Sequence, residues 1–246
     1  RRVWPLVTAL LAGLLALGIL AMCLGNYQVA PSTVAKILVG QIPGIHADVT
    51  WPRAVETVVL QVRLPRTLGA MCVGAALALS GATYQGVFRN PLVSPDLLGV
   101  SAGACVGAAS AILLHTGRAS LQVMALATGL AAVALATFIP RLLRNTSTMT
   151  LILSGVIVAG LMNSTLGLFK YIADPETELA DITYWMMGSF SLIKGSELLM
   201  VAPVMALAAT ILFAIRWRIN LLSLGDQQAK SLGVSLRSTR LTTIVC

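Results

Sequence analysis

Two apolar, glycine-rich segments follow one another within residues 63–114, and a short polar break separates them. The first covers residues 67–87 and the second residues 97–114. Neither segment has distinct polar and apolar faces, so each predicts a helix with apolar surroundings on every side. A water-soluble domain rarely holds two such helices in succession, whereas a bilayer holds them routinely. This pattern therefore predicts a helical membrane protein.

The composition supports a polytopic membrane protein. Hydrophobic residues make up 57% and charged residues 11% of the 246 residues, against about one quarter charged in a soluble domain. Apolar runs of membrane length, about 17–25 residues, predict six spans and a seventh that starts near residue 241. The six are 3–25, 67–87, 97–114, 119–143, 149–169 and 198–215. We expect one all-α transmembrane domain over residues 1–246, in an incomplete view of a longer protein.

The charges predict an orientation for these spans. If the N-terminus is cytoplasmic, the inner segments hold ten basic and two acidic residues, and the outer segments hold seven of each. All of the net charge of +8 then lies on one side. Because cytoplasmic loops carry the excess of Lys and Arg, we expect a cytoplasmic N-terminus. The basic balance therefore reports topology, and nucleic-acid binding is not expected.

The predicted helix interiors contain no Asp, Glu, Lys, Arg or His. Transporters driven by ion gradients usually need an ionisable group at that depth, so the energy source is expected outside the spans. The polar residues at depth are Ser80, Thr83, Ser154, Asn163, Ser164 and Thr165. Their ordinary role is hydrogen bonding between helices, and lining a wet path is the alternative.

Small residues recur at four-residue spacing along two spans. Gly99, Gly103 and Gly107 form one such stripe, and Gly155 with Ala159 forms another. A stripe of small residues on one helix face allows close contact with a neighbouring helix. The contact is expected either inside one subunit or at a dimer interface. The four cysteines lie in apolar segments without CxxC spacing, so neither a disulfide framework nor a metal site is expected.

A pair of arginines lies outside the predicted spans. Arg63 and Arg66 flank a Leu-Pro pair just before the second span, and their spacing can place both on one face. They are either anchors at a helix start or a cationic patch for an acidic partner or an anionic solute. Both readings remain open from the residues alone.

A short soluble-looking element covers residues 220–237, on the expected cytoplasmic side. Gly225 breaks the chain, Asp226 is expected to be the N-cap of a helix over residues 227–232, and Gly233 is expected to end it. Leu224, Ala229 and Leu232 are expected to give this helix one apolar side. So short a helix is unstable alone, so it must pack on its own membrane domain or on a cytoplasmic partner.

Four blocks of the sequence resemble one known family. They are RLPRTLGAMCVGAALALSGATYQGVFRNPLVSPDLLGVSAGA (63–104), LILSGV (151–156), YWMMGSFS (184–191) and LLSLGDQQAKSLGVSLR (221–237). The chain resembles the permease subunit of the FecCD-like ABC importers for iron–siderophores, haem and cobalamin, the type II importer class. The resemblance implies ten membrane helices in the full subunit, of which about six and a half are present here.

The resemblance also implies roles for particular residues. Arg63 and Arg66 match arginines that receive the solute-binding protein. Four further positions match the cytoplasmic gate: Asn90, Leu92, Ser147 and Thr148. Asn163 and Ser164 lie on the span expected to line the translocation path. The positions that match the ATPase-coupling helices, within residues 221–236, are Leu224, Gly225, Asp226, Ala229, Leu232 and Gly233. Met149 departs from relatives that have a small polar residue there.

The implied function is that of a multi-pass permease in the bacterial inner membrane, importing an iron(III)–siderophore chelate. Haem and cobalamin are the alternatives within the family, and an ATP-independent secondary transporter is the alternative from another class. The implied partners are a second permease subunit, two cytoplasmic ATPase subunits, a periplasmic or surface binding protein and membrane lipid. The chain lacks a phosphate-binding GxxxxGK[ST] loop. It is therefore not expected to be an enzyme or to bind a cofactor, because ATP and Mg²⁺ belong on the partner ATPase.

Overall fold

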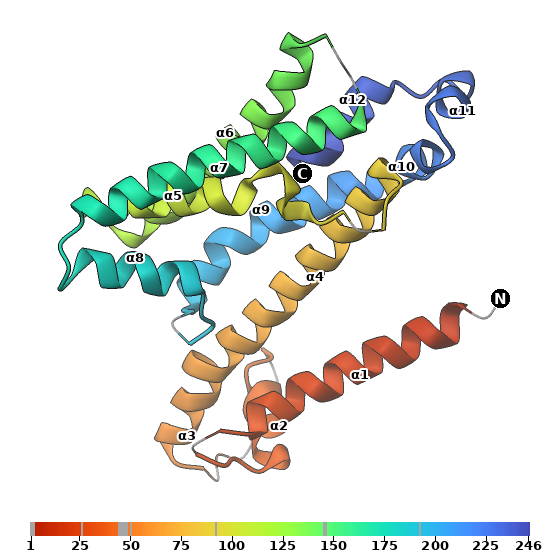
Figure 1. The fold of residues 1–246 in the computed structure, drawn as a ribbon. Coiled ribbons are helices and arrows are strands. Elements are labelled where there is room, and N and C mark those ends of the chain that lie inside the picture. The colour runs from red at the N-terminus through yellow and green to blue at the C-terminus, as the bar shows by residue number, and fades with distance from the viewer. Residues whose placement is uncertain are drawn as a thin grey trace. The chain divides into compact units, whose positions relative to one another are not determined.

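The computed structural model describes residues 3–25, 27–43, 49, 51–91, 93–144, 147–191 and 193–246. Among these residues the regular structure is helical throughout, with no strand (Figure 1). The chain divides into two compact units. The first comprises Arg1–Ala75 and Phe190–Met205, and the second comprises Ala76–Ser189 and Ala206–Cys246. The all-α architecture expected from the sequence is confirmed.

The first unit is built around one long helix and the helical hairpin that precedes it. Its elements are α1 (Val3–Cys23), α2 (Pro31–Gly40), α3 (Arg53–Thr57), the π-helical η1 (Val58–Arg63) and the start of α4 (Leu64–Phe88). The last three run on as one helix, Arg53–Phe88. The apolar pattern of the sequence predicted that this span begins at residue 67. The helix starts earlier because Val55 and Val59 bury against Met22, Val34 and Ile37 in one apolar cluster.

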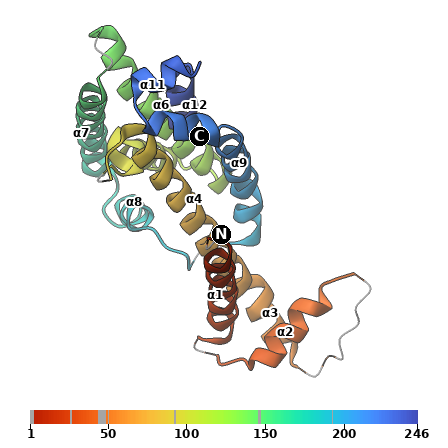
Figure 2. The same ribbon diagram turned by 90° about the vertical axis from the view of Figure 1, so that its right-hand side faces the viewer.

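The second unit holds most of the remaining helices. They are η2 (Pro95–Leu98), α5 (Val100–Leu113), α6 (Arg118–Leu142), α7 (Thr148–Ile172), α8 (Glu178–Met187), α10 (Arg216–Ser223), α11 (Asp226–Ser231) and α12 (Leu236–Val245). Helix α9 (Gly195–Ala214), like α4, contributes residues to both units. Figures 1 and 2 show the C-terminal end of α6 together with α11 and α12 at one end of this unit.

Among the described residues, five helices are long and apolar enough to cross a membrane: Val3–Cys23, Arg53–Phe88, Arg118–Leu142, Met149–Ile172 and Gly195–Ala214. The chain is therefore a multi-pass membrane protein. The sequence also predicted a span over residues 97–114. There the helix is interrupted at Gly99, which has φ +77°, so α5 has only 14 residues. A helix of that length is about 21 Å long, which is shorter than the hydrocarbon core.

Helix α5 packs against α6 and α7 through its glycines. A side chain at Gly103 would lie 2.7 Å from the Cβ of Ala132, and one at Gly107 would collide with Thr128 and the backbone of Met124. Gly155 of α7 likewise leaves no room for a side chain beside the carbonyl of Leu97. The close contact that the glycine spacing predicted is formed within one chain.

Most of the polar residues at depth do not join helices, contrary to the expectation from the sequence. Ser154 Oγ donates to the carbonyl of Thr150 at 2.7 Å, and Thr165 Oγ1 donates to the carbonyl of Leu161 at 3.0 Å. Thr83 bonds in the same way to Leu79. Each hydroxyl is thus satisfied inside its own helix, one turn back along the chain.

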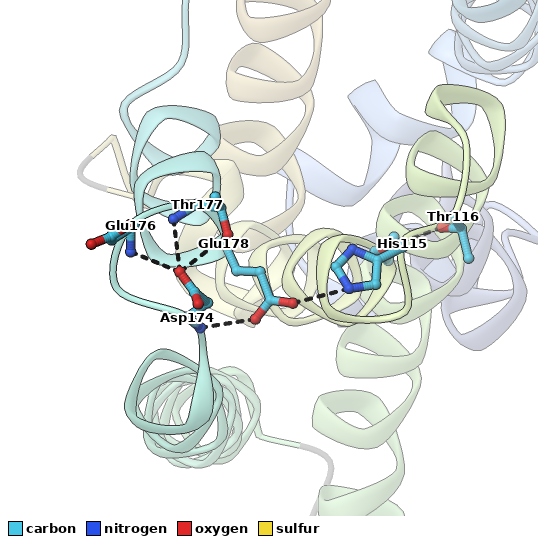
Figure 3. A network of polar contacts seen from close by, with 7 residues as sticks. His115, Thr116, Asp174, Glu176, Thr177 and Glu178 are labelled. Atoms are coloured by element: carbon cyan, nitrogen blue, oxygen red, sulfur yellow. Dashed lines mark hydrogen bonds and ion pairs between the residues drawn. The ribbon is translucent and has the colours of Figure 1, made fainter.

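A polar network connects the end of α5 to the turn between α7 and α8 (Figure 3). His115 Nε2 lies 3.2 Å from Glu178 Oε1, while Glu178 Oε2 accepts a hydrogen bond of 2.9 Å from the Asp174 amide. Asp174 Oδ1 accepts from the amides of Glu176 and Thr177 at 2.8 and 3.1 Å. These two hydrogen bonds lower the pKa of the Asp174 carboxyl. The network fixes the reversal that brings Ile182 of α8 into the core.

Candidate functional site

Arg63 is buried and its side chain holds the C-terminal end of α1. Its Nη1 donates to the carbonyl of Met22 at 2.7 Å and to that of Cys23 at 3.2 Å, and its Nη2 donates to the carbonyl of Tyr27. The carbonyls at a helix C-terminus lack intrahelical partners and carry partial negative charge, so a guanidinium suits this position. Only 9% of Arg63 is exposed.

Arg66 lies one turn further along the same helix and has a different environment. It is exposed, and its Nη2 donates to the carbonyl of Ser191 at 2.6 Å. The spacing of the two arginines in the sequence predicted that both could lie on one face of the helix. The structure separates them, because Arg63 is enclosed by carbonyls of its own chain whereas Arg66 faces outward. Docking remains a prediction for both, and the geometry favours Arg66.

The predicted gate residues fall at the end of α4 and the start of α7. Asn90 follows Arg89, whose φ of 52° ends α4 in a left-handed turn, and the Asn90 amide bonds to the carbonyl of Gln85. Ser147 is the N-cap of α7, and its Oγ accepts from the Thr150 amide at 3.1 Å. Thr148 is the first residue of α7. Leu92 lies outside the described residues, so the gate remains a prediction.

The two predicted path residues lie on an exposed face of α7. Asn163 and Ser164 are both exposed in this single chain, and Ser164 Oγ bonds to the carbonyl of Gly160 at 2.9 Å. Leu161 and Leu168, also exposed, lie near them. This face therefore mixes amide and hydroxyl groups with large apolar side chains.

Helix α11 is the element that the sequence predicted over residues 227–232, but it is capped differently. It runs over Asp226–Ser231, so Asp226 is its first residue and Gly225, with φ +123°, takes the N-cap position. At the other end Gly233 has φ +78°, and the Val234 amide bonds back to the carbonyl of Ala229 at 2.9 Å. This is the Schellman arrangement, which needs a residue that tolerates the left-handed region.

The Asp226 carboxylate is an ionic link, and it does not cap the helix. Its Oδ1 lies 2.8 Å from Nη2 of Arg240 on α12 and 3.5 Å from Nη2 of Arg89 at the end of α4. One acid therefore connects α11 to two other helices. Sequence reasoning missed both arginines as its partners. Their predicted location on the same membrane face as Asp226 was the available signal.

The apolar residues of this element face opposite ways, contrary to the single apolar side expected from the sequence. Ala229 is fully buried in a cluster with Val87, Leu212 and Leu222. Leu224 and Leu232 are 58% and 59% exposed. The element is thus fastened to its own membrane domain by Ala229 and presents two leucines outward.

Comparison with known proteins places the chain among transport permeases. A sequence model of the FecCD transport family matches residues 13–246. The molybdate import system permease protein MolB of Haemophilus influenzae is 36% identical over 222 residues, which are 90% of this chain and 65% of that protein. A probable iron chelatin transport system permease protein of Helicobacter pylori is 38% identical over 195 residues, 78% of this chain and 58% of that protein.

Two further matches cover nearly the whole chain. The vitamin B12 import system permease protein BtuC of Escherichia coli is 37% identical over 238 residues, 95% of this chain and 66% of that protein. A solved metal-chelate type ABC transporter in an inward-facing conformation has a TM-score of 0.83 at 34% identity, covering 98% of this chain and 72% of that one. The chain thus spans about two thirds or less of the length of these curated relatives.

Proposed function

This chain belongs to the FecCD transport family, and on that premise we propose that it is the transmembrane permease subunit of an ATP-driven ABC importer. The observation that carries the proposal is the arrangement of α11. A six-residue helix is too short to be stable alone. It is held by Ala229 and Asp226, while the exposed Leu224 and Leu232 offer an apolar contact to a protein outside the membrane.

In the proposed mechanism, Asp226 transmits the movement of the ATPase from α11 to other helices of the membrane domain. A separate ATPase subunit binds ATP and Mg²⁺, and its closure moves α11 through the two leucines. Asp226 then pulls on its two ion-pair partners, Arg240 of α12 and Arg89. Arg89 is the residue next to the predicted gate residue Asn90. The movement switches which side of the membrane is open, as a rigid-body form of alternating access. This chain makes and breaks no bond in the solute.

The proposed outer partner is a solute-binding protein. We place its docking contact at Arg66, because this arginine is exposed and the charge pattern of the sequence predicts it on the outer side of the membrane. An exposed guanidinium that donates to one carbonyl retains donors for an acidic residue of a partner. The N-terminus and α11 are then cytoplasmic, in a bacterial inner membrane.

The proposed solute is an iron(III)–siderophore chelate. The relatives named above include permeases for an iron chelatin, vitamin B12 and molybdate. The exposed face of α7, with Asn163 and Ser164 among leucines, suits a large neutral or weakly charged chelate passing between two permease subunits, which we propose to be identical. Haem and cobalamin are large complexes of the same kind, and molybdate is a small oxyanion.

Reconstitution of the full-length permease with its genomic neighbours in proteoliposomes tests this proposal. We expect an ATPase to co-purify, its activity to rise with the loaded binding protein, and uptake of a ferric siderophore to stop when ATP is omitted. Uptake of cobalamin, haem or molybdate in its place would correct the solute alone. Solute uptake that survives without nucleotide, with no ATPase bound, would overturn the importer and leave a secondary transporter.

A further inference from the structure

A cavity of about 800 Å³ opens at the end of the second unit where α6 ends and α7 begins. Helices α11 and α12 form its other side, and Figures 1 and 2 show these elements together. The charged residues of its lining are Arg141, Arg144, Asp226, Lys230, Arg237 and Arg240. Five of the six are cationic, so the cavity has a strongly positive lining.

The one acid in the lining does not offset this charge. Asp226 is engaged by Arg240 at 2.8 Å and by Arg89 at 3.5 Å. Within the described part of the chain, the side chains of the other four cations of the lining have no ion pair and no hydrogen-bonded partner. Like charges around one concavity repel one another, and a bound anion relieves that repulsion.

The start of α7 contributes further positive potential. Ser147, the N-cap of this 25-residue helix, lies on the cavity wall. The unpaired amides of a first helical turn carry partial positive charge and favour a negative group nearby. The cavity therefore combines cationic side chains with a helix N-terminus, as phosphate sites do.

The position of the cavity favours a lipid as the source of the anion. Helix α6 has 25 residues and is long and apolar enough to cross a membrane, and Arg141 lies in its last turn. Arg141 and Arg144 are thus at the depth of lipid headgroups. The lining also includes the apolar side chains of Phe88, Leu151 and Ile244, which suit hydrocarbon. Basic pockets between helices on the cytoplasmic side are suited to phospholipid headgroups.

We propose that this cavity binds a phosphate group, supplied by the headgroup of an anionic phospholipid. Arg141 and Arg144 contact the phosphate from the end of α6, while Lys230 and Arg237 contact it from α11 and α12. The bound lipid then bridges the start of α7 to the coupling element. Occupancy of this site can be measured without transport.

The test uses the full-length permease complex, stripped of lipid in detergent and analysed by native mass spectrometry. The probes are phosphatidylglycerol, zwitterionic phosphatidylethanolamine and sodium phosphate. The test variant is Arg141→Gln/Arg144→Gln. The matched control is Arg216→Gln/Arg218→Gln on α10, which removes the same charge near the end of a membrane helix but does not touch the cavity.

We expect the wild-type complex to retain phosphatidylglycerol over phosphatidylethanolamine. Each of the two removed cations contributes about fivefold to headgroup binding, so the test variant should lower this retention by about thirtyfold. The control should change it by less than about twofold. If the test variant fails to assemble, Lys230→Gln/Arg237→Gln probes the opposite wall, with the same expected loss.

Three results would overturn the proposal. Equal loss in the test and control variants would show diffuse surface attraction in place of a site. Absence of any preference for phosphatidylglycerol in the wild type would exclude an anionic lipid. Binding of sodium phosphate that depends on Arg141 and Arg144, without that lipid preference, would make soluble phosphate the occupant.

Discussion

Arg63 and Asp226 each join separate segments of this chain, and they differ in how their charges are satisfied. In the first unit, Arg63 is buried and gives its donors to three backbone carbonyls at the end of α1. In the second unit, Asp226 is about 41% exposed at its side chain and lies between the side chains of Arg240 and Arg89. The first joint is made to backbone, and the second is made between side chains.

The difference indicates which joint is fixed and which can move. Backbone carbonyls at a helix end stay in place while the helix stays folded, so Arg63 cannot shift without losing several buried hydrogen bonds. A half-exposed carboxylate between two flexible arginines can exchange partners in water at little cost. The chain is therefore expected to keep the α1 joint rigid and to allow motion at α11.

The largest effect is expected from Arg63→Ala. It leaves buried carbonyls without donors, so we expect the free energy of unfolding to fall by about 3 kcal/mol. Arg66→Ala, which alters an exposed arginine one turn away, should lower it by less than about 0.5 kcal/mol. Thermal unfolding of both variants in the same detergent measures this. Normal stability in Arg63→Ala, with lost affinity for the binding protein, would contradict the joint and support docking at Arg63.

A second effect is expected at Gly25, which lies against the same guanidinium. Its φ is +154°, and a Cβ there would lie 2.8 Å from Nη2 of Arg63. We expect Gly25→Ala to destabilise the protein by about 1–2 kcal/mol. Gly13→Ala in α1, where nothing lies within 4 Å of the new Cβ, should be neutral or stabilising. An equal cost of Gly25→Ala in an Arg63→Ala background would show that the two residues do not interact.

The contacts of Asp226 should contribute less to the free energy of unfolding than those of Arg63. They should contribute more to the coupling between ATP hydrolysis and transport. We expect Asp226→Asn to lower the free energy of unfolding by no more than about 1 kcal/mol. It should nevertheless lower the number of solutes moved per ATP hydrolysed, because α11 loses its link to two helices. Arg240→Gln, at 2.8 Å, should have a larger effect than Arg89→Gln, at 3.5 Å. An unchanged transport-to-hydrolysis ratio in all three variants would remove Asp226 from the coupling route.

The smallest effect concerns the turn that follows α7. Amide hydrogen bonds from Glu176 and Thr177 lower the pKa of Asp174. Its contribution to the turn is then complete above the unfolded value of about 3.9 and is lost as pH falls through the lower folded pKa. Protection of the Thr177 amide from hydrogen exchange should fall over that acidic range. In Asp174→Asn the protection should not change with pH, and a parallel fall there would assign the effect to another group.

Much of the helical layout could be predicted from the sequence. Long apolar runs specify α1, α6, α7 and α9 directly, because length and hydropathy are local properties. The glycine stripe also predicted the close packing of α5, since only small residues permit that approach. The break at Gly99 was missed, because a left-handed residue inside an apolar run leaves the hydropathy unchanged.

The partners of charged side chains could not be predicted in the same way. Arg63 and Arg66 look alike in sequence, and only the return of α1 beside the long helix buries one of them. Asp226 was expected to cap its own helix, but tertiary contacts placed Arg240 and Arg89 beside it. Leu224 and Leu232 were grouped with Ala229 because sequence spacing does not report the bends at Gly225 and Gly233. Long-range contacts decide each of these cases.

The central claim is that the outward leucines beside α11 contact a separate ATPase, and site-specific photo-crosslinking tests it most directly. A photo-reactive residue is placed at Leu224, at Leu232 or, as controls, at the buried Ala229 and at the exposed Tyr184 of α8. We predict crosslinks to a co-expressed ATPase from positions 224 and 232, with a yield that changes when ATP is added, and none from the controls. Crosslinks from Tyr184 alone, or from none of the positions in a complex that transports, would contradict the account.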